Sequence, residues 1–497
     1  MNTLAADANG VELRTEPGAA AAIESVPGAR LSIDNVWASA ALAMAVFLGL
    51  LGPLYATDLA YHLRAGQAML ATHHLPGVDT FTFTVTGRSW VDQQWGAQVL
   101  LAVVYRIGGF SGLVMLRGVV VGASYGLLWL ACRARGASRR TSSVLTVAGL
   151  LVGFLNTGMR PQTLAFPLFT GALWIVASRR AHPRRLWLLP ALALVWANLH
   201  GSFLVLPIVI ALAVAEDLRD RASTMRTTVV AGSLAIAATL ANPFGAGAWR
   251  YAIGITTNGR ILQQIVEWQP TGIRTMAGAL FFLSALAVAG YLARRAAPTD
   301  PMLLAWLGAF FLIALPALRG VVWWGFVFPF ALAALPEAGT VHEARTGNPV
   351  MNRLMIGLLA ATVAVALPWW HTGIDPATGA SSLLGAAPQG LVQQTVRRLP
   401  PGGHAFVAEP FASWFEFAAP AIPVFVDSRI ELFPDRVWND YLNVLEGREG
   451  WQAILDRWGV DAVVLQTDPS GLSTRIARDP RWRLAYRDPL GALYVRA

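Results

Sequence analysis

Apolar residues fall along this chain in blocks of about 15 to 20, and short arginine-bearing segments separate the blocks. That block length is typical of helices that cross a bilayer. The two blocks that meet at 199–201 are short, which favours a tight hairpin that does not cross the full bilayer. We predict eleven spans, at 37–56, 112–132, 143–159, 162–178, 186–199, 202–216, 227–243, 276–293, 302–318, 321–336 and 354–370.

The first long interruption, 57–111, contains two stretches with amphipathic helical spacing, at about 58–72 and 93–107. The second stretch is almost apolar enough to be a span. If it were a span, the arginines at 133–140 would lie outside, whereas a helix in the membrane interface keeps them in the cytoplasm. We therefore predict an outer loop with two interfacial helices.

The two ends of the chain differ from the middle. Residues 1–35 are polar and have no basic segment directly before the first span, which predicts a disordered cytoplasmic tail. A membrane domain is predicted over 36–370, and charged residues return in 371–497. This last part predicts a small extracytoplasmic α/β domain, with strands at 405–408, 424–426 and 462–465 and helices at 434–446 and 449–458.

The composition agrees with a membrane protein, since 55% of the residues are hydrophobic and only 13% are charged, against about 25% in soluble proteins. The formal net charge is +9, and arginine supplies all the basic charge because the chain has no lysine. The positive-inside rule accounts for these arginines, so no nucleic-acid partner is expected. The single cysteine, Cys132, excludes an intramolecular disulfide. The arginines gather in the connections predicted to be cytoplasmic, at 133–140, 179–185, 219–226, 294–295 and 345–353.

Asp58 falls where the first span ends and an interfacial helix begins. A carboxylate at the membrane surface is costly unless it is solvated or has a function. A helix N-cap explains Asp58 equally well. His62 follows one turn later, so both side chains are predicted to share one helix face, where solvent contact is the alternative to a shared cleft.

Asp92 stands at the start of the second interfacial helix, two residues before Gln94 and between Trp90 and Trp95. Indole rings anchor at the headgroup level, which alone explains the tryptophans, and Asp92 is again a possible helix cap. Two acids at the starts of two surface helices in one loop nevertheless predict a cleft at the membrane boundary.

Arg160, His200 and Arg319 map to the predicted outer ends of spans. An arginine at a helix end often snorkels or caps carbonyl groups, and His200 has its own hairpin backbone as a partner. Several arginines that point into one cleft would instead bind a phosphate, because the guanidinium group matches phosphate oxygens.

The polar segments of the first loop, those at the outer ends of the spans and one in the C-terminal part follow one another in an order that resembles uncharacterised bacterial members of the GT-C superfamily of membrane glycosyltransferases. That superfamily contains protein O-mannosyltransferases and the aminoarabinose and galacturonic acid transferases that act on lipid A. The likeness covers most of the membrane domain and is carried by the order of its segments, at 58–66, 77–81, 90–95, 160–162, 196–203 and 424–429.

The resemblance implies transfer of a sugar from a polyprenyl-phosphate donor to a lipid, glycan or protein acceptor on the extracytoplasmic face of a bacterial inner membrane. It implies that Asp58 is the catalytic general base and that Asp92 positions the acceptor or a catalytic partner. The predicted substrate-binding residues are His62, Arg64, Gln94, Arg160, His200 and Arg319.

The loop has no Asp-x-Asp pair, so no metal or other cofactor is expected, although a divalent metal stays possible. The C-terminal domain has no glycine-rich phosphate loop, which argues against a nucleotide-sugar donor. Asp427 and Arg429 are predicted to form a structural ion pair.

Three other functions fit a polytopic chain. A transporter or lipid flippase is the main alternative, but transporters often show inverted repeats and broken helices at mid-bilayer, whereas the acids here lie in one surface loop. A polysaccharide polymerase or ligase would share the lipid carrier and differ in the acceptor. A non-catalytic assembly protein is the third alternative.

Overall fold

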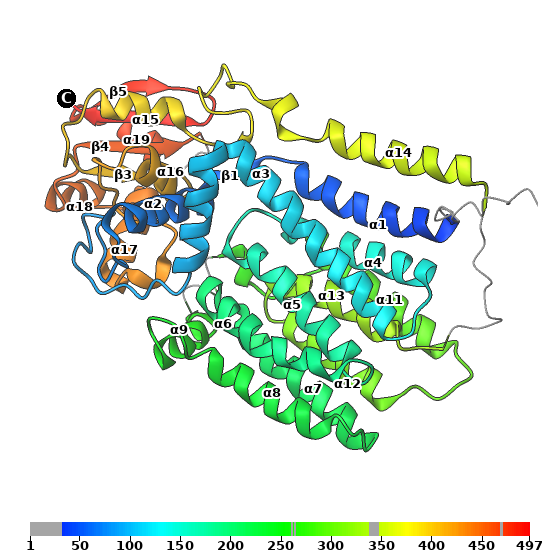
Figure 1. Ribbon diagram of the computed structural model, residues 1–497. Helices are drawn as coiled ribbons and strands as arrows, with labels where there is room; N and C mark the ends of the chain where they lie inside the picture. The colour runs from blue at the N-terminus through cyan, green and yellow to red at the C-terminus, as the bar shows by residue number, and fades with distance from the viewer. Residues whose placement is uncertain (1–31, 260–261, 263–264, 337–346, 468–470) are drawn as a thin grey trace, which may run out of the picture.

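The computed structural model describes residues 32–259, 262, 265–336, 347–467 and 471–497. It contains a bundle of helices and, at one end of the bundle, an α/β part made from the C-terminal residues (Figure 1). Residues 1–31 of the predicted tail therefore lie outside the described residues.

A helix occupies each of the eleven predicted spans. Within the part of the chain that the structure describes, four stretches are long and apolar enough by themselves to cross a membrane: Ile33–Leu50, Trp95–Ala134, Gly201–Arg219 and Met276–Ala293. The chain is thus an α-helical, polytopic membrane protein with a small sheet-containing part near its C-terminus. The helices are α1 (Ile33–Leu50), α3 (Trp95–Ala134), α4 (Arg139–Gly153), α5 (Pro161–Ser178), α6 (Leu189–Leu199), α7 (Leu206–Arg219), α8 (Met225–Ala238), α11 (Met276–Ala293), α12 (Pro301–Ala314), α13 (Val321–Leu332) and α14 (Pro349–Val365).

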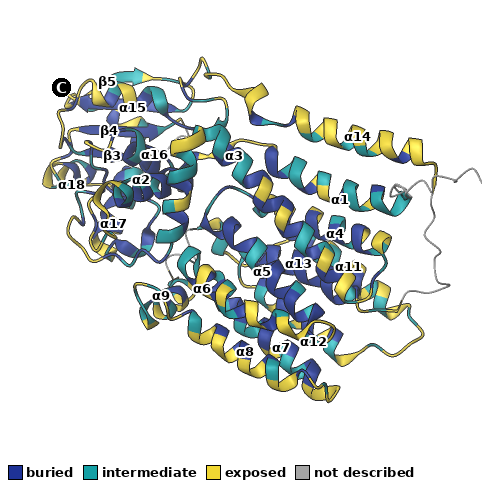
Figure 2. Cartoon of the chain, viewed as in Figure 1, coloured by how far each residue is buried: buried dark blue, intermediate teal, exposed yellow. Residues whose placement is uncertain are grey.

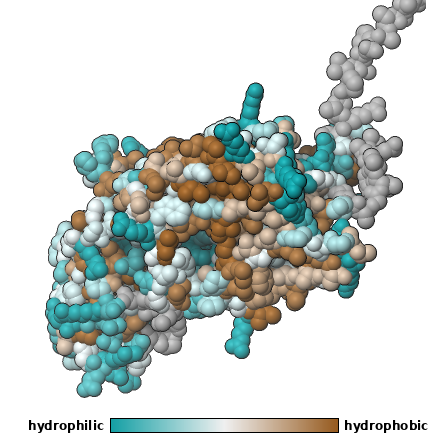
Figure 3. Space-filling model, turned by 90° about the horizontal axis from the view of Figure 1, so that it is seen from below, coloured by the Kyte–Doolittle hydropathy of each residue, from teal (hydrophilic) through white to brown (hydrophobic). Residues whose placement is uncertain are grey.

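The helix α13 lies at the centre of the bundle and α14 at its edge (Figure 2). Aromatic side chains of α13 fill the core, while α4 approaches α13 closely at two glycines. A Cβ atom on Gly149 would lie 2.3 Å from the carbonyl oxygen of Gly325, so only glycine fits there. The face shown in Figure 3 is largely hydrophobic over the bundle and largely hydrophilic over the C-terminal part, as a membrane protein requires.

The first loop contains the two predicted helices. One is α2 (Ala56–Thr72), and the other is the first part of α3. The backbone of Gly109 is not helical, with φ 57° and ψ −149°, which favours glycine and separates this loop helix from the span that follows in α3. The loop helix and the span are therefore two helices that meet at a kink. A further short helix that the sequence analysis did not predict, α9 (Ala246–Thr257), follows α8.

The C-terminal part contains a four-stranded sheet in the order β3-β4-β6-β5, in which β3 and β4 are parallel and the other pairs antiparallel. Its strands are β3 (Ala405–Val407), β4 (Ala462–Gln466), β5 (Trp482–Arg487) and β6 (Gly491–Arg496). Its helices are α15 (Gln389–Val396), α16 (Glu409–Ala418), α17 (Asp435–Leu445), α18 (Trp451–Arg457) and α19 (Gly471–Ile476).

The predicted strand at 424–426 is wrong. Val424 makes only isolated bridges, to Ala405 and to Thr82 of the first loop. Its N–H donates to the carbonyl of Phe81 and its carbonyl accepts from the N–H of Phe83, so the first loop takes the hydrogen bonds that a neighbouring strand would use. The segment is buried because it lies between the loop and the sheet.

The first loop and the C-terminal part share one hydrophobic core. Phe81, Val85 and Trp90 of the loop belong to the same buried cluster as Phe425 and Trp438. In addition, α2 packs against α16, and the two-residue strands β1 (Leu54–Tyr55) and β2 (Leu384–Gly385) pair in parallel. The loop is therefore held rigidly against the C-terminal part.

Candidate functional site

A cavity of about 900 Å³ lies between the helix bundle and the C-terminal part. The bundle contributes the start of α2, the connection from α4 to α5, and the short 3-10 helix η4 (Val266–Trp268). The opposite wall comes from the start of α16 and from α17. The principal lining residues are Thr57, Arg160, Glu267, Glu409, Ser428 and Trp438.

Asp58 follows Thr57, a lining residue, in the first turn of α2. Its backbone is helical, while its side chain lies outside the described part of the structure. The proposed role of Asp58 as general base therefore stays a prediction that rests on its position.

Asp92, Gln98 and His62 form a buried polar chain across the two helices of the first loop. The side-chain Nε2 of Gln98 donates to Asp92 Oδ1 at 2.8 Å and lies 3.2 Å from His62 Nδ1. Among the described residues, Asp92 Oδ2 and Gln98 Oε1 are buried without a hydrogen-bond partner. Because a buried acceptor without a partner is costly, these two oxygens are suited to receive a hydrogen bond from a substrate.

The surroundings shift the pKa values of both ends of this chain. Burial raises the pKa of Asp92 to about 7, although the charge of Arg429 and the hydrogen bond from Gln98 oppose the rise. Burial, helped by the charge of Arg160, lowers the pKa of His62 to about 3. At neutral pH, His62 is thus an uncharged imidazole, and Asp92 is protonated in part of the molecules.

Arg160 and Arg319 converge on Glu267. Arg160 Nη1 lies 2.5 Å and Arg319 Nη2 3.7 Å from Glu267 Oε2. Burial raises the pKa of the Glu267 carboxyl, but the two arginines outweigh it and the net pKa is lowered. Arg319 also stacks over the ring of Trp268 at 4.6 Å and donates to Gln162 Oε1 at 3.3 Å. The two predicted phosphate-binding arginines therefore lie together beside the cavity.

Arg160 is placed by the start of α5. It is the N-cap residue, and Pro161 occupies the first turn, where the missing N–H of proline costs nothing. Arg319 lies in the 3-10 helix η5 (Leu318–Gly320), just before α13. Both arginines thus stand at helix ends on the same side of the bundle.

Three other predicted site residues make mainly local contacts, although His200 lies within electrostatic reach of Arg319, His62 and Arg160. His200 Nδ1 accepts from the N–H of Ser202 at 3.0 Å, so the histidine caps its own hairpin. Arg64 is half-buried and lies over the ring of Phe81 at 5.7 Å, and Gln94 is the residue before α3. His200, Arg64 and Gln94 are not among the described residues that line the cavity.

The structure brings in acids that the sequence analysis did not select. Glu267 is one, and Glu431 of the C-terminal part is another, since Tyr251 of α9 donates to Glu431 at 2.6 Å. Burial raises the pKa of Glu431, whose carboxyl acts electrostatically on Asp92.

The predicted Asp427–Arg429 ion pair is confirmed and is part of a larger cluster. Arg429 Nε donates to both Asp427 oxygens, at 3.0 and 3.1 Å, and Nη2 donates to Asp79 Oδ1 at 2.6 Å. The guanidinium group also stacks over Trp90 at 4.5 Å. This cluster fixes the first loop against the C-terminal part.

Comparison with solved structures identifies the fold. The chain is similar to ArnT from Cupriavidus metallidurans bound to undecaprenyl phosphate, with a TM-score of 0.51 and 13% identity over 94% of this chain and 98% of ArnT. It is also similar to the mycobacterial arabinofuranosyltransferase AftD, with a TM-score of 0.53 and 16% identity over 93% of this chain but only 40% of AftD. The chain has the GT-C fold.

No protein-family model and no curated protein matches the sequence. The resemblance that the order of segments predicted is nevertheless confirmed at the level of the GT-C fold. The cavity, the Asp92–Gln98–His62 chain and the two arginines all belong to the end of the bundle that carries the first loop.

No group of three or more His, Cys, Asp or Glu side chains that could hold a metal ion occurs among the described residues. Because the Asp58 side chain is not among them, metal independence stays a prediction.

Proposed function

We propose that this chain transfers a glycosyl group from a polyprenyl-phosphate donor to a lipid, glycan or protein acceptor on the extracytoplasmic side of a bacterial inner membrane. The observation that carries the proposal is that Arg160 and Glu267 line one cavity of a GT-C fold, and that Arg319 pairs with the same Glu267. The buried carboxyl of Asp92 lies at the same end of the bundle. ArnT, which shares this fold, binds undecaprenyl phosphate, and this supports a lipid-phosphate donor.

The arginines account for the donor end of the reaction. Without a donor, Arg160 and Arg319 both pair with the carboxylate of Glu267, which keeps the two guanidinium groups together beside the cavity. A donor phosphate placed there would receive charge-assisted hydrogen bonds from both groups. These bonds strengthen as the phosphate becomes the leaving group, which lowers the barrier to transfer.

The acids account for the acceptor end. An acceptor oxygen forms a bond to the anomeric carbon while the bond from that carbon to the phosphate oxygen breaks, and the electron pair leaves with the phosphate. We assign the proton of the acceptor hydroxyl to the carboxylate of Asp58. Asp92, held by Gln98, orients the acceptor through Oδ2, which has no hydrogen-bond partner among the described residues. The proposal needs no cofactor.

The test is transfer of labelled sugar from polyprenyl-phosphate donors to a membrane extract by the purified full-length protein. Asp58→Asn is expected to lower transfer about 10²- to 10⁴-fold, the usual contribution of a general base. Asp456→Asn is the matched control, because Asp456 pairs with Arg481 and Arg496 on the surface of the C-terminal part. Equal transfer by Asp58→Asn and wild type would reduce Asp58 to a helix cap.

A further inference from the structure

A second cavity, of about 550 Å³, lies at the other end of the bundle. The N-termini of α3 and α5 are next to the candidate site, whereas their C-termini border this second cavity. The connections that follow α3, α5, α7 and α11 meet at this cavity, and the sequence analysis places all four on the cytoplasmic side. Their arginines therefore lie close together. We call it the arginine cavity, after its lining residues Arg135, Arg179, Arg180, Arg219 and Arg295.

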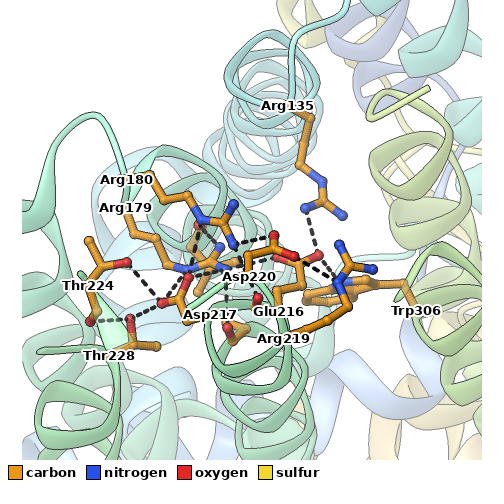
Figure 4. A network of polar contacts seen from close by, with 12 residues as sticks. Arg135, Arg179, Arg180, Glu216, Asp217, Arg219, Asp220, Thr224, Thr228 and Trp306 are labelled. Carbon is orange, nitrogen blue, oxygen red and sulfur yellow. Dashed lines mark hydrogen bonds and ion pairs between the residues drawn. The ribbon is translucent and has the colours of Figure 1, made fainter. Parts of the chain in front are cut away.

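Two acids of α7 brace the floor of the arginine cavity. Arg179 lies 2.9 Å from both Glu216 and Asp217 (Figure 4). Asp217 is fully buried and also accepts from the hydroxyls of Thr224 and Thr228. Arg179 and Asp217 are thus fully engaged within the protein.

Partly exposed ion pairs line the entrance of the arginine cavity. Arg180 pairs with Asp220 at 2.9 Å, and Arg219 pairs with both Asp220 and Asp300. The side chains of Arg180 and Arg219 are 46% and 41% exposed, so solvent reaches this entrance. The Arg219–Asp300 pair connects α7 to the start of α12.

Arg135 and Arg295 keep donors to spare. Arg135 donates through Nη1 to Glu216 at 2.8 Å, while its Nε is buried without a partner among the described residues. Its guanidinium group stacks over the ring of Phe330 at 4.4 Å, which fixes its orientation. Arg295 donates through Nη1 to the hydroxyl of Tyr291 at 3.1 Å, and no acid pairs with it in the part of the chain that the structure describes.

Among the described residues, the charges in the arginine cavity do not balance. Five arginines face four acids, namely Glu216, Asp217, Asp220 and Asp300, which leaves one positive charge. The excess belongs to the two arginines with spare donors. A bound anion would satisfy the buried Nε of Arg135 and neutralise this excess.

We propose that the arginine cavity binds a phosphate group through Arg135 and Arg295. The guanidinium fork matches phosphate oxygens, and the cavity lies at an end of the bundle where anionic headgroups of the membrane would be at hand. The ligand is an anionic lipid headgroup or free inorganic phosphate, which have the same binding chemistry. This proposal is independent of the proposed transfer reaction.

The test uses the purified full-length protein in phosphatidylcholine nanodiscs. One arm titrates inorganic phosphate, and the other replaces part of the lipid with phosphatidylglycerol, with thermal stability and native mass spectrometry as readouts. Arg295→Gln is the main variant, because Arg295 has no ion pair among the described residues and its loss leaves the internal brace intact. Arg135→Gln is the second variant. Each is expected to weaken binding about tenfold.

Arg294→Gln is the matched control, since Arg294 is an exposed neighbour that, within the described residues, donates only to the carbonyl of Gly290 and does not line the cavity. Its affinity is expected to equal that of wild type. Binding of phosphatidylglycerol but not of inorganic phosphate assigns the site to a lipid headgroup, and the reverse assigns it to the free ion. Failure of both probes to bind wild type, or equal binding by wild type and Arg295→Gln, would overturn the proposal.

Discussion

Arg429 donates to Asp79 at 2.6 Å, although 350 positions of sequence separate the two residues. The bond is fully buried and joins the C-terminal part to the first loop. Because Asp92 and α2 belong to the same loop, the position of the candidate acids depends on this contact. The C-terminal part therefore shapes the candidate site from outside the bundle.

Loss of Arg429 should destabilise the protein strongly. Arg429→Met leaves the buried carboxylates of Asp79 and Asp427 without their cation, which costs roughly 3–5 kcal/mol when one partner of a buried pair is removed. Arg448→Met, which breaks a surface pair with Glu446, should cost about 0–1 kcal/mol. Chemical denaturation in detergent compares the two. Equal stability of both variants would show that the buried cluster does not hold the loop.

Asp92 should make stability depend on pH. Its pKa rises from 3.8 to about 7 on folding, so the folded state binds more protons than the unfolded state between these values. Stability from this group is therefore present at low pH and is lost as pH rises through about 7. Asp92→Asn cannot ionise, so its stability relative to wild type should increase over that window. Thermal unfolding of both proteins across the window measures the difference, and parallel curves would contradict the raised pKa.

Arg160 and Arg319 should act on the donor. Arg160→Gln and Arg319→Gln each remove a charge that the proposal gives to the donor phosphate, so donor KM should rise about tenfold or more. Arg184→Gln, at an exposed position on η2 (Pro183–Leu188) at the other end of the bundle, is the control and should leave KM unchanged. Steady-state kinetics with varied donor distinguishes them. Because the same bonds strengthen in the transition state, kcat should fall as well. Unchanged kcat and KM in both variants would place the two arginines away from the donor phosphate.

Two glycines should respond oppositely to alanine. Gly149→Ala places a methyl group 2.3 Å from the carbonyl oxygen of Gly325, and the overpacking should cost about 1–3 kcal/mol. Gly357 of α14 has no atom within 4 Å of an added Cβ, so Gly357→Ala should be neutral or stabilising by up to about 1 kcal/mol. Thermal unfolding of the two variants tests this, and similar losses would contradict the close contact of α4 with α13.

The bundle was predictable because its signal is strong. Apolar blocks of spanning length have few other structures open to them, and all eleven became helices. The short helix α9 and the segment at 424–426 were harder, because their conformations depend on distant partners. The backbone of Val424 pairs with Thr82 of the first loop, and the local sequence around Val424 does not predict this contact.

The candidate site was predictable only in part. Asp92, Arg160 and Arg319 lie where the order of segments placed them, at one end of the bundle. The sequence analysis missed Glu267 and the Tyr251–Glu431 pair. Glu267 pairs with Arg160, and Tyr251 with Glu431, across more than 100 positions of sequence, and no local pattern predicts such contacts. Periodicity locates helices, but it does not say which loops meet.

The most direct test of the account measures two products of one reaction. Purified wild-type protein is given a labelled polyprenyl-phosphate sugar and acceptor membranes, and both the transferred sugar and the released polyprenyl phosphate are counted. Glycosyl transfer predicts one released polyprenyl phosphate for each sugar attached, and almost none of either with Asp58→Asn. Movement of the intact donor across liposomes without release of polyprenyl phosphate would contradict the account and favour a flippase.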